Sequence, residues 1–178
     1  MVYLFLANGF EECEALVPLD ILRRANIEVK TVGIGSNTIT GSHGISVNCD
    51  TVNKDLPLED LKGIILPGGL PGATNLEADK TVQATIDYCV ENGLLISAIC
   101  AAPQILGHKG LLNGKNAVCF PGFEKELIGA NIVSQKVVAD ANFITAWGAG
   151  AAFEFGFKIL EYITNKQTAD NLQQSMKY

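Results

Sequence analysis

The sequence predicts an α/β fold, in which a mostly parallel sheet carries helices on both faces. Two observations lead to this prediction. Short apolar runs rich in β-branched residues alternate with segments of helical periodicity, an order typical of βαβ units. The 178 residues are also 48% hydrophobic and only 18% charged, which is typical of a globular chain large enough to bury a core. We expect one domain over residues 1–178, with two β-hairpin excursions from the sheet.

The first half of the chain contains three expected strands, one helix and one hairpin. Pro18 lies inside the expected helix, which should therefore begin late or bend. Gly41–Gly44 separates two short β-rich runs, as in a hairpin turn. The expected strands are Val2–Ala7, Ile27–Ile34 and Gly63–Leu66, the helix is Glu12–Ala25, and the hairpin arms are Thr38–Thr40 and Ile45–Val47.

The second half continues the alternation. Gly93 should end a helix, and Asp140–Ala141 should form the turn of a second hairpin. The expected helices are Thr81–Glu91, Ala101–His108, Phe123–Ile128, Ala149–Thr164 and a polar helix at the C-terminus. The expected strands are Leu94–Ile99, Ala117–Phe120, Ile132–Ala139 and Asn142–Trp147.

Charge and cysteine usage exclude several classes of protein. A net charge of -6 argues against a large nucleic-acid surface. No apolar run reaches the roughly 20 residues of a membrane helix, and the N-terminus lacks the basic region of a signal peptide. The five cysteines form no CxxC pair, and the two histidines give no metal-ligand spacing. We therefore expect a cytoplasmic protein without disulfides, metal or other cofactor, and without a membrane or nucleic-acid partner.

Cys100 is the strongest candidate for a reactive residue. The apolar run before it leads directly into an expected helix, so the cysteine would stand at a sharp strand-to-helix turn. Ala98, Ala101 and Ala102 are small enough for such a turn. Backbone N–H groups at the helix N-terminus would favour the thiolate and lower the thiol pKa. A buried structural cysteine is the alternative, and the spacing alone favours it.

Glu14 and the Gly68–Gly69 pair are the other candidates at strand ends. Acidic residues in a first helical turn commonly serve only the helix dipole, which suffices for Glu11 and Glu12. Glu14 precedes the apolar face of its helix and could reach the cleft. There it would hold a proton and donate a hydrogen bond to a thiolate. The two glycines allow backbone N–H groups to approach a substrate oxygen, although an ordinary turn explains them equally well.

Neither histidine has an obvious catalytic partner. His108 lies at an expected helix end, and His43 lies in a hairpin turn, so both are expected at the surface. No histidine is near Cys100 in sequence, and a Cys–His dyad would require a distant residue.

Three segments taken together resemble the ThiJ/PfpI family, and in particular its parkinsonism-associated, deglycase-like branch. They are Gly9–Glu14, Leu66–Gly69 with Asn75–Leu76, and Ala98–Pro103. The similarity continues through Gly148–Phe155 and so extends over nearly the whole chain. The combination is specific, whereas each motif alone is weak.

The resemblance implies a flavodoxin-like sandwich, related to class I glutamine amidotransferases and usually assembled as a homodimer. It implies that Cys100 is the nucleophile and the oxidation-prone thiol, and that Glu14 hydrogen-bonds it. Gly69 and Ala101 match the positions whose backbone N–H groups surround the reacting oxygen. The family's activities include cofactor-free conversion of methylglyoxal to lactate, removal of early glycation adducts, redox sensing and chaperone-like protection.

Three departures from the family pattern bear on activity. Protease-type members have histidine directly after the cysteine, and Ala101 at this position argues against a peptidase. The deglycase-like branch often has a histidine where Phe120 stands, so a general base is missing and weaker glyoxalase activity is expected. Some relatives place arginine at the position of His43, near the partner's cysteine pocket, which suggests His43 as a supporting residue.

Three functions therefore remain open on the sequence. The first is an enzyme acting on small reactive carbonyl compounds through the Cys100 thiolate and Glu14. The second is a non-enzymatic redox sensor, or a protein that protects against oxidative stress, with an oxidisable Cys100. The third is a protein that retains the cysteine but binds another ligand.

Overall fold

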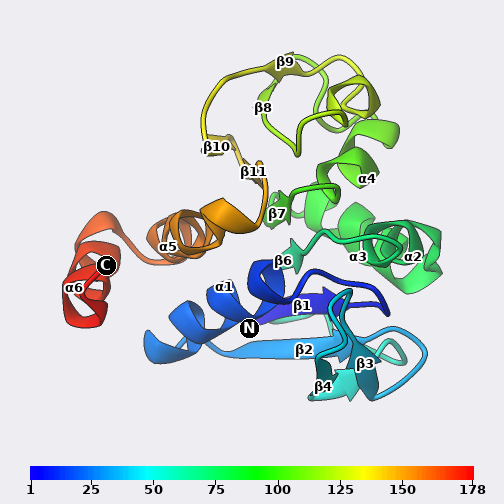
Figure 1. Ribbon diagram of the computed structural model, residues 1–178, viewed down its shortest axis with the longest axis horizontal. Helices are drawn as coiled ribbons and strands as arrows, with labels where there is room; N and C mark the ends of the chain where they lie inside the picture. Colours follow the sequence, from blue (N-terminus) through cyan, green and yellow to red (C-terminus); the bar gives the residue numbers. More distant parts are fainter.

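The computed structural model describes all 178 residues, and its centre is a seven-stranded sheet (Figure 1). The strand order is β10-β11-β7-β6-β1-β2-β5. Neighbouring strands are parallel, except that β10 and β11 are antiparallel. The bounds are β1 Val2–Leu6, β2 Val29–Gly33, β5 Thr51–Val52, β6 Gly63–Leu66, β7 Leu95–Ile99, β10 Val137–Asp140 and β11 Phe143–Ala146. The predicted mostly parallel α/β sandwich is confirmed.

Helices cover both faces of this sheet (Figure 1). On one face lie α1 (Glu12–Arg24) and α5 (Ala152–Ile163), with α6 (Lys166–Met176) packed against α5. On the other lie α2 (Gly72–Ala78), α3 (Lys80–Glu91) and α4 (Pro103–His108). None of the helices has the combination of length and apolar character needed to cross a membrane.

Alternating side chains of the interior strand β1 contribute to two cores. On β1, Tyr3 and Phe5 join the cluster beneath α2, α3 and α4, whereas Val2, Leu4 and Leu6 join the cluster beneath α1 and α5. All five are fully buried, which explains why this strand reads as a continuous apolar run rather than an alternating one.

The two predicted hairpins differ in their place in the fold. Strands β3 (Thr38–Thr40) and β4 (Ser46–Asn48) form a separate antiparallel pair, as predicted. The second hairpin, β10 and β11, is instead an edge of the main sheet. Only the first is therefore an excursion from the sheet.

Some element boundaries differ from the predictions. Helix α1 begins at Glu12 and continues through Pro18, so the predicted late start is wrong. The strand predicted at Ala117–Phe120 is only β8, Asn116–Ala117, paired in parallel with β9, Asn131–Ile132. Beyond it, the Val118 N–H donates at 3.0 Å to the side-chain hydroxyl of Thr145 on β11 rather than to the backbone of a neighbouring strand. Two 3-10 turns, η1 (Glu124–Glu126) and η2 (Ala149–Ala151), occupy parts of the segments predicted as helix.

The loops after β1, β6 and β7 meet at the carboxyl edge of the sheet. The Glu11 N–H donates to the Gly68 carbonyl at 3.0 Å, and the Gly72 N–H donates to the Gly9 carbonyl at 3.2 Å. These bonds join the first loop to the second, and Cys100 follows β7 directly beside them. The fold thus assembles one cluster from three segments that are distant in sequence.

Candidate functional site

Cys100 stands at the end of β7 in a left-handed backbone conformation, with a φ of 66°. A non-glycine residue in this region is uncommon and carries local strain. Two backbone hydrogen bonds, each 2.9 Å, hold the turn: the Cys100 N–H donates to the Ala146 carbonyl, and the Cys100 carbonyl accepts from the Phe120 N–H. The residue is partly exposed, in contrast to the buried Cys49, Cys89 and Cys119.

The helix after Cys100 begins later than predicted. Ala101 and Ala102 form a turn, and α4 starts only at Pro103. Cys100 is therefore three residues away from the helix N-terminus. The prediction of a direct strand-to-helix junction is wrong, whereas the sharp turn at the cysteine is confirmed.

Glu14 lies beneath Cys100 and is almost completely buried, with 1% of its surface exposed. It belongs to the first turn of α1, where the Glu11 carboxylate caps the helix by accepting from the Glu14 N–H at 2.7 Å. The Glu14 carboxyl accepts from the Gly68 N–H at 2.9 Å and shares a hydrogen bond with the Cys100 thiol. The structure therefore brings these two predicted residues into contact.

Burial raises the pKa of both acids in this pair. It raises the pKa of Glu14 to about 7, although hydrogen bonds from Cys100, Gly68 and Ala149 favour the carboxylate. Burial, and then the charge of Glu14, raise the pKa of the Cys100 thiol to about 12. This is opposite to the low thiol pKa predicted from the helix N-terminus. Between these two values the pair retains one proton and carries one negative charge.

Gly68 and Gly69 are required by close approaches around the cysteine. A Cβ on Gly68 would lie 2.6 Å from both the Cys100 Cβ and a Glu14 carboxylate oxygen. Gly69 has a φ of +83°, in the region that favours glycine. The backbone N–H groups of Gly69 and Ala101 donate to the Cys100 sulfur. Two backbone donors thus point at the sulfur and favour its charged form.

This arrangement of a strained cysteine, a buried glutamate and two N–H donors can be compared with known proteins. The model of the DJ-1/PfpI family matches residues 1–162. The chain belongs to the DJ-1/PfpI family. The resemblance drawn from the three loop motifs is thereby confirmed.

Individual DJ-1/PfpI proteins match the chain over most of its length. Protein dj-1beta of Drosophila melanogaster is 32% identical over 174 residues, which cover 96% of this chain and 93% of the relative. A deglycase of Pyrococcus horikoshii is 34% identical over 150 residues, or 82% and 89% of the two chains. The solved structure of oxidized Toxoplasma gondii DJ-1 superimposes with a TM-score of 0.95 at 31% identity, covering 99% and 97%.

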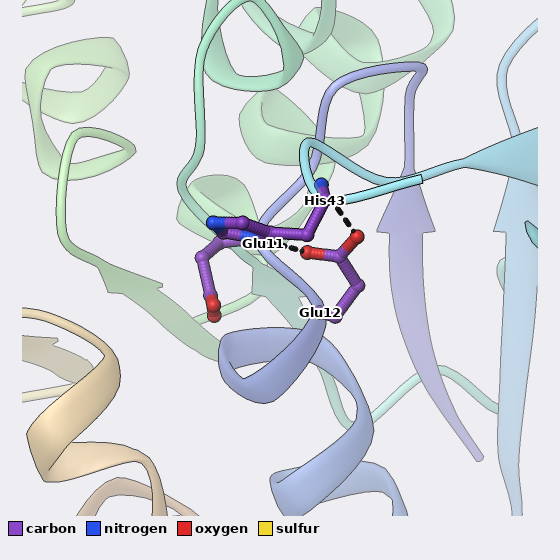
Figure 2. Close-up of side chains that lie close together, drawn as sticks. All are labelled: Glu11, Glu12 and His43. Carbon is purple, nitrogen blue, oxygen red and sulfur yellow. Dashed lines mark hydrogen bonds and ion pairs between the residues drawn. The ribbon is translucent and has the colours of Figure 1, made fainter. Parts of the chain in front are cut away.

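In this DJ-1/PfpI chain, His43 binds Glu12, and its place near a partner's cysteine pocket stays a prediction. The His43 ring Nδ1 is 2.7 Å from Glu12 Oε2, and the His43 N–H donates to Glu12 Oε1 at 2.8 Å (Figure 2). The Glu12 carboxylate is buried, and it ties the turn of the β3–β4 hairpin to the start of α1. Interaction with the helix dipole, which was expected to account for an acidic residue at position 12, is therefore only part of the role of Glu12.

Glu11, Glu12 and His43 also bring ligand-type atoms within 4.8 Å of one another. Sequence analysis found no metal spacing, because His43 is 31 residues from Glu12. Three of the four carboxylate oxygens in this cluster already accept hydrogen bonds that serve the fold. Both Glu12 oxygens accept hydrogen bonds from the hairpin, and Glu11 Oε2 accepts from the Glu14 N–H. We interpret the cluster as a structural clamp.

The remaining histidine and cysteines lie elsewhere. His108 contacts Glu77 and Glu126 at 2.5 and 2.8 Å, near the surface as predicted. The other cysteines bear on how selective thiol chemistry would be. Cys13 is exposed on α1, whereas three are buried, namely Cys49, Cys89 and Cys119.

The structure also contains a hollow that sequence analysis missed. Phe120 and Trp147 flank it, and its volume is about 390 Å³. The two aromatic residues are 27 positions apart, so no local sequence pattern could have revealed the hollow. Phe120, noted in the sequence only as a missing histidine, is thus part of a surface beside the cysteine.

Proposed function

We propose that the protein is a cofactor-independent enzyme acting on small reactive carbonyl compounds, of the glyoxalase or deglycase type. The observation that carries this proposal is the contact of the buried Glu14 carboxyl with a partly exposed Cys100. Relatives that are named deglycases support the same chemistry.

The proposed reaction on a 2-oxoaldehyde starts with a proton on Glu14 and the negative charge on Cys100. The sulfur attacks the aldehyde carbon, a C–S bond forms, and the carbonyl oxygen becomes a hydroxyl by taking the Glu14 proton. The Gly69 and Ala101 N–H groups stabilise the negative charge that develops on this oxygen.

An internal transfer of two electrons follows. The Glu14 carboxylate removes the hydrogen of the former aldehyde carbon as a proton, which gives an enediolate and leaves the proton on Glu14 for the next step. Protonation of the neighbouring carbon then gives a thioester of a 2-hydroxy acid. One carbon is oxidised and the other is reduced, so no external oxidant is required. Water attacks the thioester, the C–S bond breaks, and the 2-hydroxy acid leaves.

Turnover of methylglyoxal without glutathione or added metal tests this proposal. We expect Cys100→Ser to abolish turnover and Cys13→Ser to retain it, because Cys13 is exposed and lies outside the cluster. Equal rates in the two variants would contradict a nucleophilic role for Cys100.

Whether Cys100 or Glu14 carries the negative charge of the pair can be tested separately. The test is alkylation of Cys100 at a series of pH values, read by mass spectrometry. If the sulfur carries the charge, the midpoint lies near 7, where the pair loses its first proton, and below the free-thiol value of about 8.5. Glu14→Gln should also stay below that value, because an amide still donates to sulfur. A wild-type midpoint near 12 that falls by several units in Glu14→Gln would place the charge on Glu14 instead.

Redox sensing is the second candidate function, and it is favoured by the different exposure of the cysteines. Cys49, Cys89 and Cys119 are buried, and of the two cysteines with exposed surface, Cys13 and Cys100, it is Cys100 that hydrogen-bonds Glu14. The Cys100 sulfur would attack hydrogen peroxide, the O–O bond would break, and water would leave behind a sulfenic acid. Glu14 would then hydrogen-bond the added oxygen. Oxidation of Cys49 or Cys89 before Cys100 under mild peroxide would contradict this function.

A further inference from the structure

The hollow beside the cysteine is lined almost entirely by apolar atoms. Its six residues are Phe120, Pro121, Trp147, Gly148, Ala149 and Gly150, and none of them carries a charged side chain. Phe120 is 48% exposed and Trp147 is 36% exposed, so two aromatic side chains present open surface here. A group that covers them would remove apolar surface from water on both sides.

Two hydrogen bonds and the position of Gly148 connect this hollow to the Cys100–Glu14 pair. The Phe120 N–H donates to the Cys100 carbonyl at 2.9 Å, and the Ala149 N–H donates to the Glu14 carboxyl. At Gly148, a Cβ would be 4.0 Å from Glu14 Oε1 and 3.2 Å from a ring carbon of Phe120. A substrate held by Cys100 and Glu14 therefore has this hollow as its neighbour.

The lysine that contacts Trp147 is already paired with a carboxylate. The backbone carbonyl of Lys136 accepts from the Trp147 N–H, and the Lys136 ammonium is 3.1 Å from Glu154 Oε1. The hollow thus offers no free cation to an anionic or phosphorylated substrate. Its surface suits a neutral apolar group, and its volume of about 390 Å³ has room for a phenyl ring.

We propose that Phe120 and Trp147 make this site selective for carbonyl compounds with an aromatic or bulky apolar substituent. The carbonyl would react at Cys100, and the substituent would lie in the hollow. This inference rests on the proposed function, because it names the substrate class of the same site. The covalent steps are those given above, with an aryl group in place of the methyl group.

The selectivity is tested by measuring kcat/KM for phenylglyoxal and for methylglyoxal. We expect wild type to prefer phenylglyoxal by roughly tenfold or more, as for other differences in apolar pocket filling. Phe120→Ala and Trp147→Ala should lose most of this preference through a higher KM for phenylglyoxal. Val90→Ala removes an exposed apolar side chain of α3 and should retain the preference. A preference that is absent in wild type, or unchanged in both aromatic variants, would overturn the inference.

A binding experiment separates this inference from the proposed function. Acetophenone has the phenyl ketone but no aldehyde, and Trp147 is the only tryptophan, so its fluorescence can report binding without turnover. We expect saturable binding of acetophenone, weakened about fivefold or more by Phe120→Ala and unchanged by Val90→Ala. Absence of binding would overturn the aromatic pocket even if methylglyoxal is consumed. Binding without turnover of either aldehyde would support the pocket and overturn the proposed enzyme.

Discussion

At the scale of single residues, the site depends on how little space separates Gly68, Glu14 and Cys100. The carboxyl and the thiol come together because no side chain stands between them. Burial raises both pKa values, and the charge of Glu14 raises that of Cys100 further, whereas the hydrogen bond from Cys100 favours the Glu14 carboxylate. The reactive group is therefore the pair, with its one shared proton, rather than the cysteine alone.

A methyl group at Gly68 should disrupt this pair. In Gly68→Ala the new Cβ would overlap Cys100 and Glu14, so we expect a loss of about 1–3 kcal/mol in the free energy of unfolding and much slower alkylation of Cys100. Urea unfolding and mass spectrometry measure the two effects. At Gly150 a Cβ meets no atom within 4 Å, so Gly150→Ala should unfold like wild type. Normal stability and normal alkylation in Gly68→Ala would show that the pair adapts to the added group.

The sequence predicted the residues of this site better than their energetics. Cys100, Glu14 and Gly69 were found because each follows a recognisable strand or opens a helix, and parallel strands place such ends together. The helix N-terminus, predicted as the cause of a low thiol pKa, lies too far along the chain, and the effects of burial and the nearby carboxylate come from tertiary packing. The hollow between Phe120 and Trp147 was missed for the same reason.

At the scale of elements, the clearest feature is the clamp between α1 and the β3–β4 hairpin. The Glu12 carboxylate accepts hydrogen bonds from the hairpin turn, and a side chain at Gly41 would overlap it. Burial by itself would raise the Glu12 pKa, but the hydrogen bonds from His43 and Ile45 outweigh it and lower the pKa to about 2. The hairpin was predicted from its turn, whereas the clamp could not be, because it joins residues 31 positions apart.

We expect Glu12→Gln to lower the free energy of unfolding by about 1–3 kcal/mol at pH 6. A carboxyl whose folded pKa is depressed stabilises the fold above its unfolded value of about 4.5 and loses this contribution as the pH falls toward 2. The difference between variant and wild type should therefore be smaller at pH 3.5 than at pH 6. Urea unfolding at both values measures it.

The exposed Glu91 at the end of α3 provides the matched control for this measurement. Glu91→Gln should unfold like wild type at both pH values, because it breaks no buried contact. If Glu12→Gln shows the same loss at pH 3.5 and pH 6, the ionised form of Glu12 is not what holds the hairpin.

At the scale of the whole molecule, one sheet serves two cores. The strands of the sheet contribute side chains to both clusters. If the helices on one face came away, the apolar side chains on that face of the same strands would be exposed to water. The order of elements along the chain predicted this arrangement. It did not predict which hairpin joins the sheet, since that depends on the pairing of β11 with β7.

We expect substitutions in the two cores to affect one common unfolding transition. Ile86→Ala on α3 and Ile159→Ala on α5 lie in different clusters and are both fully buried. Each should cost about 2–5 kcal/mol. Far-ultraviolet circular dichroism and Trp147 fluorescence should give coincident transitions in both variants. Two separate transitions would show that the faces unfold independently.

The ends of the sheet have a consequence for self-association. Strand β5, at one edge, is only two residues long, and β10, at the other, is four residues long with β8 packed against it. Little free strand backbone is left for another chain to extend the sheet, which is the common route to fibrous aggregates. A second copy of the chain would therefore have to bind through side chains of helices and loops. The short edge strands thus protect the fold against open-ended association by strand pairing.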